Sequence, residues 1–182
     1  MQRSTLMPAL KLTWNDYLRL PDDGRRYEIL DGDVVVSPSA GSPHQGIQAA
    51  LSCQLFLRIQ RRGLGRVFGD LDCELLAHDI VRPDLLVVLP AHYDRIARTR
   101  VLGTPDLVIE ILSPGNKTRD RQQKRCRYEH AGTPELWLVD GDRKTITQFV
   151  HNGQRFAAPL VAKRSLRLAI LPSVVIALAD IW

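Results

Sequence analysis

Two short, uninterrupted apolar runs constrain the fold of this chain more than any other feature. They are DLLVVL at residues 84–89, which follows Pro83, and LVIEIL at residues 107–112. Runs of this length without polar alternation are typical of interior strands whose two faces are both covered. Each run nevertheless contains one acid, Asp84 or Glu110. The sequence therefore predicts central strands of a sheet that carry two carboxylates in apolar surroundings.

Periodic apolar positions and composition predict two main helices. Every fourth residue from 47 to 59 is apolar, which is typical of one helix face, and Ser42-Pro43 is a typical helix start. Residues 118–131 have helical composition and are followed by Gly132, a common helix terminator.

Two glycine-containing turns predict hairpins. Asp31-Gly32-Asp33 lies between two β-forming segments, and Asn152-Gly153 lies between residues 145–150 and 154–158. Such dipeptides are typical of tight hairpin turns. Residues 174–178 add a strand near the C-terminus. We therefore expect an α/β (mixed α+β) fold, with a mixed β-sheet flanked by helices and additional N- and C-terminal hairpins.

The composition is that of a folded globular protein. Of the 182 residues, 45% are hydrophobic and 25% are charged, and the length fits one domain over residues 1–182. No run of 18 apolar residues is present, so we expect no membrane partner. The three cysteines form no CxxC pair, which argues against a zinc ribbon, a redox dithiol or a disulfide framework. Reduced cysteines favour a cytoplasmic location.

Basic residues concentrate in one segment of a chain whose net charge is +5. Between positions 117 and 127 there are one acid, Asp120, and six basic residues: Lys117, Arg119, Arg121, Lys124, Arg125 and Arg127. Such a cluster can bind a polyanion, although a solvated helix face is the commoner outcome for charge runs. We interpret it as a candidate contact for a nucleic-acid backbone.

Asp84 and Glu110 are candidates for a metal site. An ionised carboxylate in an apolar strand is costly unless it is paired or coordinates a metal. If the two strands are neighbours, the carboxylates can converge at one end of the sheet, where two hard oxygen ligands suit Mg²⁺. The alternative is a structural ion pair with one of the many arginines, and spacing alone does not decide between the two.

Several segments resemble a known nuclease family. Proline-aspartate at the head of a strand, followed about 26 residues later by a strand glutamate, resembles the PD-(D/E)XK nuclease superfamily. The segments YEILDG, SPHQ, VRPDLLVV, EILSP and ELWLVD, in this order, resemble the Uma-type family of putative restriction endonucleases of bacteria. The resemblance covers about residues 12–140, and NGQRF and LPSVVIALADIW continue it more weakly. PD and ExL alone are weak motifs, whereas the ordered combination is specific.

The resemblance implies a restriction-endonuclease-like core with a divalent metal, Mg²⁺ or alternatively Mn²⁺, at one edge. It assigns the metal-binding acids to Asp84 and Glu110, and a third, main-chain ligand to the carbonyl of Ile111. The superfamily lysine is expected two residues after the glutamate, where this chain has Leu112. Lys124, on the following helix, could reach back to the site in its place, or it could pair with Asp120 on the surface of that helix.

Two further candidates lie in segments that match the family. Glu28 could add a metal ligand or position Lys124, although alternation in a strand also allows it to face solvent. His44 lies in the first turn of the long helix, where it could touch phosphate or shuttle a proton. A lone histidine at a helix start is more often polar surface.

We therefore predict a Mg²⁺-dependent DNA endonuclease that hydrolyses phosphodiester bonds through a metal-activated water. The predicted catalytic residues are Asp84, Glu110, Lys124 and Glu28, and the predicted nucleic-acid contacts are His44, Lys117, Arg119, Arg121 and Arg125. One alternative is a catalytically inactive DNA-binding or regulatory module that retains the fold, which the leucine in the lysine position favours. Another is an assembly protein that uses the late hairpins as its interface. Cutting both strands of DNA needs two sites, so a homodimer accords with the first hypothesis.

Overall fold

A six-stranded mixed sheet forms the centre of the molecule. The computed structural model describes residues 10–37, 40–113 and 118–182, and of residues 118–121 it describes the backbone only. The strand order is β11-β10-β9-β8-β6-β3; β8 and β9 are parallel and the other neighbours are antiparallel. The strands are β3 (Arg66–Gly69), β6 (Leu85–Val88), β8 (Leu107–Ile111), β9 (Glu135–Asp140), β10 (Thr145–Val150) and β11 (Leu160–Ala162).

A second sheet and a C-terminal hairpin flank this centre. The second sheet has the order β2-β1-β5-β4-β7, in which only β4 and β7 are parallel. Its strands are β1 (Arg26–Leu30), β2 (Asp33–Ser37), β4 (Asp72–Leu76), β5 (Asp79–Val81) and β7 (Arg100–Leu102). The hairpin pairs β12 (Ser165–Arg167) with β13 (Val175–Ala177).

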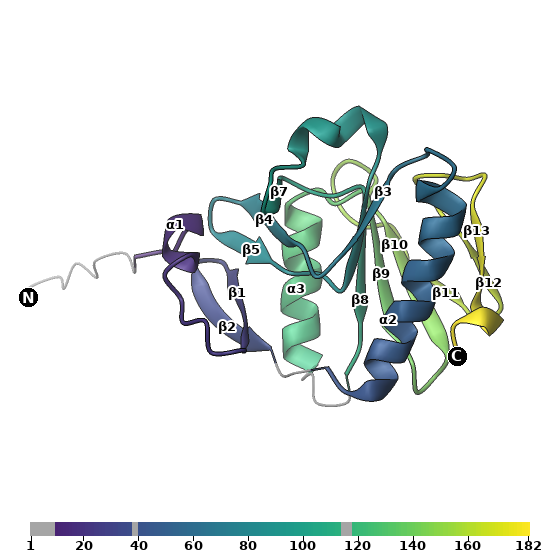
Figure 1. Ribbon diagram of the computed structural model, residues 1–182, viewed down its shortest axis with the longest axis horizontal. Coiled ribbons are helices and arrows are strands. Elements are labelled where there is room, and N and C mark those ends of the chain that lie inside the picture. The colour runs from purple at the N-terminus through teal and green to yellow at the C-terminus, as the bar shows by residue number, and fades with distance from the viewer. Residues whose placement is uncertain (1–9, 38–39, 114–117) are drawn as a thin grey trace, which may run out of the picture.

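Two long helices cover opposite faces of the central sheet (Figure 1). The helix α2 (Ser42–Leu55) continues into a π-helical turn, η1 (Phe56–Gln60), on one face, and α3 (Thr118–His130) lies on the other. Shorter helices are α1 (Trp14–Tyr17), η2 (Pro90–Arg95) and η3 (Leu178–Asp180). Among the described residues, no helix is long and apolar enough to cross a bilayer.

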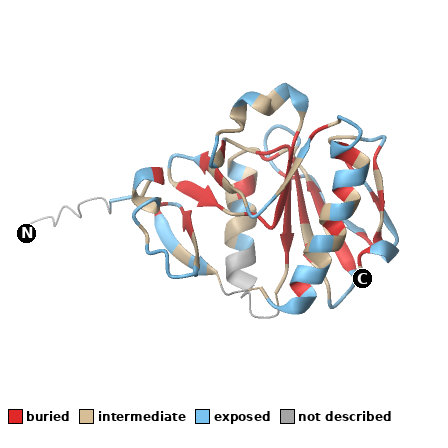
Figure 2. Cartoon of the chain, viewed as in Figure 1, coloured by how far each residue is buried: buried red, intermediate tan, exposed pale blue. Residues whose placement is uncertain are grey.

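The central strands are buried on both faces, as their continuous apolar sequences predict. In β6, Leu85 and Val87 pack in the core that includes residues of α2 and the C-terminal hairpin, whereas Leu86 and Val88 pack in the core that includes Tyr128 of α3 and residues of the second sheet. Figure 2 shows these strands as the buried centre between helices whose outer faces are exposed. Because both sides are covered, any charged group on these strands must find its partner inside the protein.

The first predicted hairpin is confirmed and the second is wrong in its pairing. Asp31 and Gly32 form the two-residue turn between β1 and β2. Such a turn needs two residues with left-handed backbone angles, and the φ values of Asp31 and Gly32 are 55° and 86°. Residues 154–158 do not form the partner of β10; β11 takes that place, and only one isolated bridge, between His151 and Phe156, occurs near the second turn.

Candidate active site

The two acids predicted from the apolar runs meet at one end of the central sheet. β6 and β8 are antiparallel neighbours in which Leu85 is paired with Ile109. Asp84, directly before β6, therefore lies opposite Glu110 near the end of β8. The backbone N–H of Ile111 donates to Asp84 Oδ2 at 2.7 Å, which holds the Asp84 carboxylate beside β8.

Asp84 is a buried, charge-paired carboxylate. Arg26 Nη1, from β1, donates to Oδ1 at 2.9 Å, and His44 Nε2, from the first turn of α2, lies 3.2 Å from Oδ2. Burial alone raises the pKa of Asp84, but the hydrogen bond from His44, the charge of Arg26 and the N–H of Ile111 lower it below its usual value. The pKa of His44 is raised in turn, chiefly by its bond to Asp84. Asp84 is therefore ionised at neutral pH.

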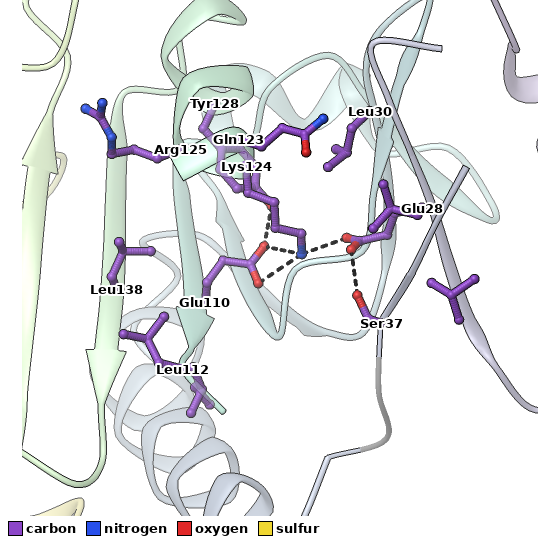
Figure 3. Close-up of a pocket in the computed structure, with 13 residues that line it drawn as sticks. Glu28, Leu30, Ser37, Glu110, Leu112, Gln123, Lys124, Arg125, Tyr128 and Leu138 are labelled. Carbon is purple, nitrogen blue, oxygen red and sulfur yellow. Dashed lines mark hydrogen bonds and ion pairs between the residues drawn. The ribbon is translucent and has the colours of Figure 1, made fainter. Parts of the chain in front are cut away.

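Glu110 is bound by two side chains of α3 (Figure 3). Lys124 Nζ lies 3.1 and 3.2 Å from the two Glu110 oxygens, and Tyr128 Oη donates to Oε1 at 2.6 Å. Lys124 and Tyr128 are four residues apart, so one helix face delivers both. Burial raises the pKa of Glu110, and the Asp84 charge adds to this, whereas Lys124 lowers it. Lys124 thus reaches the site from the helix.

Glu28 completes the network behind Lys124. It is fully buried in β1, and its Oε1 lies 2.8 Å from Lys124 Nζ. Oε2 accepts from Ser37 Oγ at 3.1 Å, and Oε1 also accepts from the N–H of Arg82 at 2.9 Å. Burial lowers the pKa of Lys124, but the charges of Glu110 and Glu28 outweigh it and raise that pKa above its usual value. Lys124 therefore remains a cation, and Glu28 faces it instead of solvent.

Two small pockets open at this network. One, of about 30 Å³, is bordered by Arg26, His44, Asp84, Glu110 and Ile111, among others. The other, of about 60 Å³, has Glu110 and Lys124 on one side and otherwise largely apolar walls that include Leu30, Leu112 and Leu138 (Figure 3). Asp84 and Glu110 therefore share a cavity, and it lies next to a second one between the β1–β2 hairpin and α3.

The donor set at the first pocket fits a Mg²⁺-like ion. An ionised carboxylate offers about four lone-pair sites, and hydrogen bonds from the described residues use three on Asp84 and three on Glu110. The N–H and C=O groups of one strand residue point toward the same side of the strand. Because the N–H of Ile111 donates to Asp84, the Ile111 carbonyl also points toward the Asp84 side of β8. Among the described residues no cluster of three acidic, histidine or cysteine ligands occurs, so the candidate protein ligands are the two carboxylates and the Ile111 carbonyl.

The ion pair with an arginine that the sequence left as an alternative is present. Arg26 Nη1 lies 2.9 Å from Asp84 Oδ1, and Lys124 Nζ lies between Glu110 and Glu28. Both candidate metal ligands therefore already have a cationic partner.

Comparison with known proteins identifies the family. The sequence model of the family Uma2, described as "Putative restriction endonuclease", matches residues 14–179. The chain belongs to the Uma2 family. No curated protein matches it significantly.

The fold of this Uma2 chain is shared with a solved structure. A crystal structure described as a putative nuclease belonging to DUF820, from Anabaena variabilis, is 20% identical, with a TM-score of 0.78 over 93% of this chain and 97% of that chain. At this identity the likeness shows the fold, a restriction-endonuclease-like mixed α/β architecture. A DrdV–DNA complex, at 12% identity, aligns with a TM-score of 0.36 over 65% of this chain and 12% of that one, which is too distant to support an argument.

Two arginines of the predicted basic cluster, Arg125 and Arg127, have different surroundings. Lys117 lies outside the described residues, and the side chains of Arg119 and Arg121 are likewise outside them. Arg125 lies over the Phe149 ring, 5.6 Å from its centroid, and borders the apolar pocket. Arg127 instead turns inward to two acids of the second sheet and its hairpin, Asp31 at 2.9 Å and Asp79 at 3.4 Å.

Arg26 and Tyr128 are site residues that the sequence did not point to, and Arg26 is the less expected of the two. Its charge pairs with Asp84, 58 residues away in the sequence, and no local pattern announces this contact. One signal was available: Arg26 and Glu28 are two apart in a strand and therefore project from the same face. Because Arg26 and Glu28 lie on one face of β1, they can take part in the same cluster of ion pairs.

Proposed function

We propose that this Uma2 protein is a divalent-metal-dependent DNA endonuclease. The observation that carries the proposal is that Asp84 and Glu110 border one pocket while Lys124 contacts Glu110 from α3. Asp84, Glu110 and the carbonyl of Ile111 would hold Mg²⁺ or Mn²⁺. Such an ion activates water at neutral pH and offsets charge on a phosphodiester.

Lys124 takes the role of the lysine that Leu112 replaces. Because the charges of Glu110 and Glu28 raise the pKa of Lys124, its amine stays protonated and acts as a hydrogen-bond donor, not as a base. As a donor it would orient the attacking water or stabilise negative charge that develops on the phosphoryl oxygens. Glu28 would position this ammonium, since it contacts Nζ at 2.8 Å from the side away from Glu110.

The DNA backbone would lie across the open side of this pocket. His44 borders it from α2, and Arg125 borders the neighbouring apolar pocket from α3. Together with Lys117, Arg119 and Arg121 they would supply phosphate contacts, which give affinity that is sensitive to salt and largely independent of sequence. A homodimer would bring two such sites to the two strands.

The test is cleavage of plasmid and linear duplex DNA in Mg²⁺ by wild type and by Asp84→Ala. We expect cleavage by wild type and none by the variant. Glu74→Gln is a matched control, because Glu74 is also an acid paired with an arginine, Arg100 at 2.8 Å, but lies in the second sheet outside both pockets. Equal cleavage by wild type and Asp84→Ala would refute the assigned site.

A second function, a DNA-binding or regulatory module without catalysis, is favoured by one observation. Leu112 stands where the superfamily has its lysine, and both candidate ligands already have cationic partners. Calorimetric titration with Mg²⁺ separates the two functions. Absence of binding at millimolar Mg²⁺, with DNA binding intact, would favour the module.

A further inference from the structure

Arg26 holds Asp84 with only part of its guanidinium. Its side chain is 21% exposed and reaches the 30 Å³ pocket from the start of β1. Nη1 donates to Asp84 Oδ1 at 2.9 Å and lies 3.6 Å from Asp70. The ion pair therefore uses one corner of a group that carries five N–H donors.

The other edge of the guanidinium is buried without a partner. Among the described residues, five buried side-chain nitrogen or oxygen atoms have no hydrogen-bond partner, and three of them are Arg26 Nε, Arg26 Nη2 and His44 Nδ1. Both residues border the same pocket beside Asp84. Buried donors without acceptors are rare and costly, and they commonly indicate a group that binds there. These atoms therefore indicate an acceptor that is supplied from outside the chain.

The unpartnered pair has the geometry of an oxyanion site. Nε–H and Nη2–H lie along one edge of the planar guanidinium, and two parallel N–H groups of this kind match two oxygens of a phosphate. Arg26 borders the pocket that also contains Asp84 and Glu110, and its Nε and Nη2 are buried next to this pocket, so an oxyanion that reaches them by a small shift of the side chain would lie beside the proposed metal ligands.

We propose that Arg26 binds the phosphodiester group of the substrate through Nε–H and Nη2–H. This proposal rests on the proposed nuclease function and names a phosphate-binding residue that the resemblance does not assign. Arg26 keeps Nη1 on Asp84 while the opposite edge holds two phosphate oxygens. The same side chain thereby fixes the distance between the acid at position 84 and the bound phosphate.

Nitrogen-15 NMR of the arginine Nε–H groups tests the contact directly in the full chain. The Arg26 signal is assigned by through-bond correlation with its own backbone, and the wild type is titrated with inorganic phosphate without divalent ions and then with a short DNA duplex in Ca²⁺ in place of Mg²⁺. We expect the Arg26 signal to shift with both probes. Failure of either probe to shift it would overturn the proposal, whether or not Arg26→Lys folds.

The affinity of Arg26→Lys for duplex DNA gives a second readout. Lysine keeps the charge but loses the two-donor edge, so we expect the duplex affinity of the folded variant in Ca²⁺ to fall about tenfold or more. Arg25→Lys is the matched control, because Arg25 is a neighbouring, 66% exposed arginine paired with Asp23. Equal affinities of the two variants would overturn the proposal.

The outcomes separate this inference from the nuclease proposal. Mg²⁺-dependent cleavage with an unshifted Arg26 signal overturns the phosphate contact and leaves the nuclease. A shift with phosphate and with duplex, without cleavage in Mg²⁺, supports the contact and overturns the nuclease.

Discussion

Replacement of Lys124 by methionine tests the buried network that supports the site. Lys124 Nζ lies between Glu110, at 3.1 and 3.2 Å, and Glu28, at 2.8 Å, and its side chain is 18% exposed. Methionine retains most of the aliphatic chain but removes the charge, so two buried carboxylates lose their shared cation. Removal of one partner from a buried ion pair costs about 3–5 kcal/mol.

The expected loss is large enough for thermal unfolding to resolve. For a domain of this size, 1 kcal/mol corresponds to about 2–4 °C in melting temperature, so Lys124→Met should melt about 6–20 °C below wild type. Calorimetry at pH 7 with EDTA measures the difference in the metal-free protein. EDTA is included because a bound divalent ion would itself neutralise Glu110 and reduce the effect.

An exposed ion pair provides the control. Lys11 pairs with Asp31, and both side chains are about half exposed, at 50% and 49%. Exposed pairs contribute only about 0–1 kcal/mol, so Lys11→Met should melt within a few degrees of wild type. If Lys124→Met melts as high as Lys11→Met, then Lys124 does not neutralise buried carboxylates and the account of the site is wrong.

Further predictions concern the acids and the position of the lysine. Asp84→Asn should lose both Mg²⁺ binding by calorimetry and cleavage, and retention of either would contradict its role as a ligand. EDTA should abolish wild-type cleavage, with recovery on excess Mg²⁺; cleavage that continues in EDTA would exclude a metal-dependent reaction. Tyr128→Phe removes a hydrogen bond to a charged group, so chemical denaturation should show a loss of about 1.5–3 kcal/mol, and no loss would mean that the bond to Glu110 is not formed. Residue 112 borders the same pocket as Lys124, so adding Leu112→Lys to Lys124→Met should recover part of the melting temperature and of the cleavage that Lys124→Met alone loses. A double variant no better than Lys124→Met would show that the two positions are not equivalent.

The central strands and the two acids could be predicted because their signals are local. Continuous apolar runs indicate strands that are covered on both faces, and the cost of burying a charge identifies Asp84 and Glu110 as residues that need partners. The first hairpin could also be predicted from the sequence, since Asp31-Gly32 supplies both left-handed positions of its turn.

The partners themselves could not be predicted from local patterns. Arg26 and His44 reach Asp84 across 58 and 40 residues, and the burial of Glu28 depends on how the second sheet packs against α3. Strand alternation and a lone histidine at a helix start allow exposed positions just as well. These contacts follow from tertiary packing.

The error at the second turn has a specific cause. Asn152 Oδ1 accepts from the N–H groups of Gln154 and Arg155, and Glu129 of α3 accepts from the N–H of Phe156. These side chains satisfy the backbone that a hairpin strand would have used. The N–H of Ala157 still donates to the carbonyl of Val150 at 2.9 Å, but continuous pairing with β10 begins only at β11.

The position of a bound divalent ion shows whether Asp84 and Glu110 are metal ligands. Crystals grown with Mn²⁺ and measured at an anomalous wavelength would show the ion independently of any activity. We predict one peak within coordination distance of carboxylate oxygens from both Asp84 and Glu110, close to the carbonyl of Ile111. A well-ordered site without a peak, with Arg26 and Lys124 still bound to the two carboxylates at saturating Mn²⁺, would contradict it.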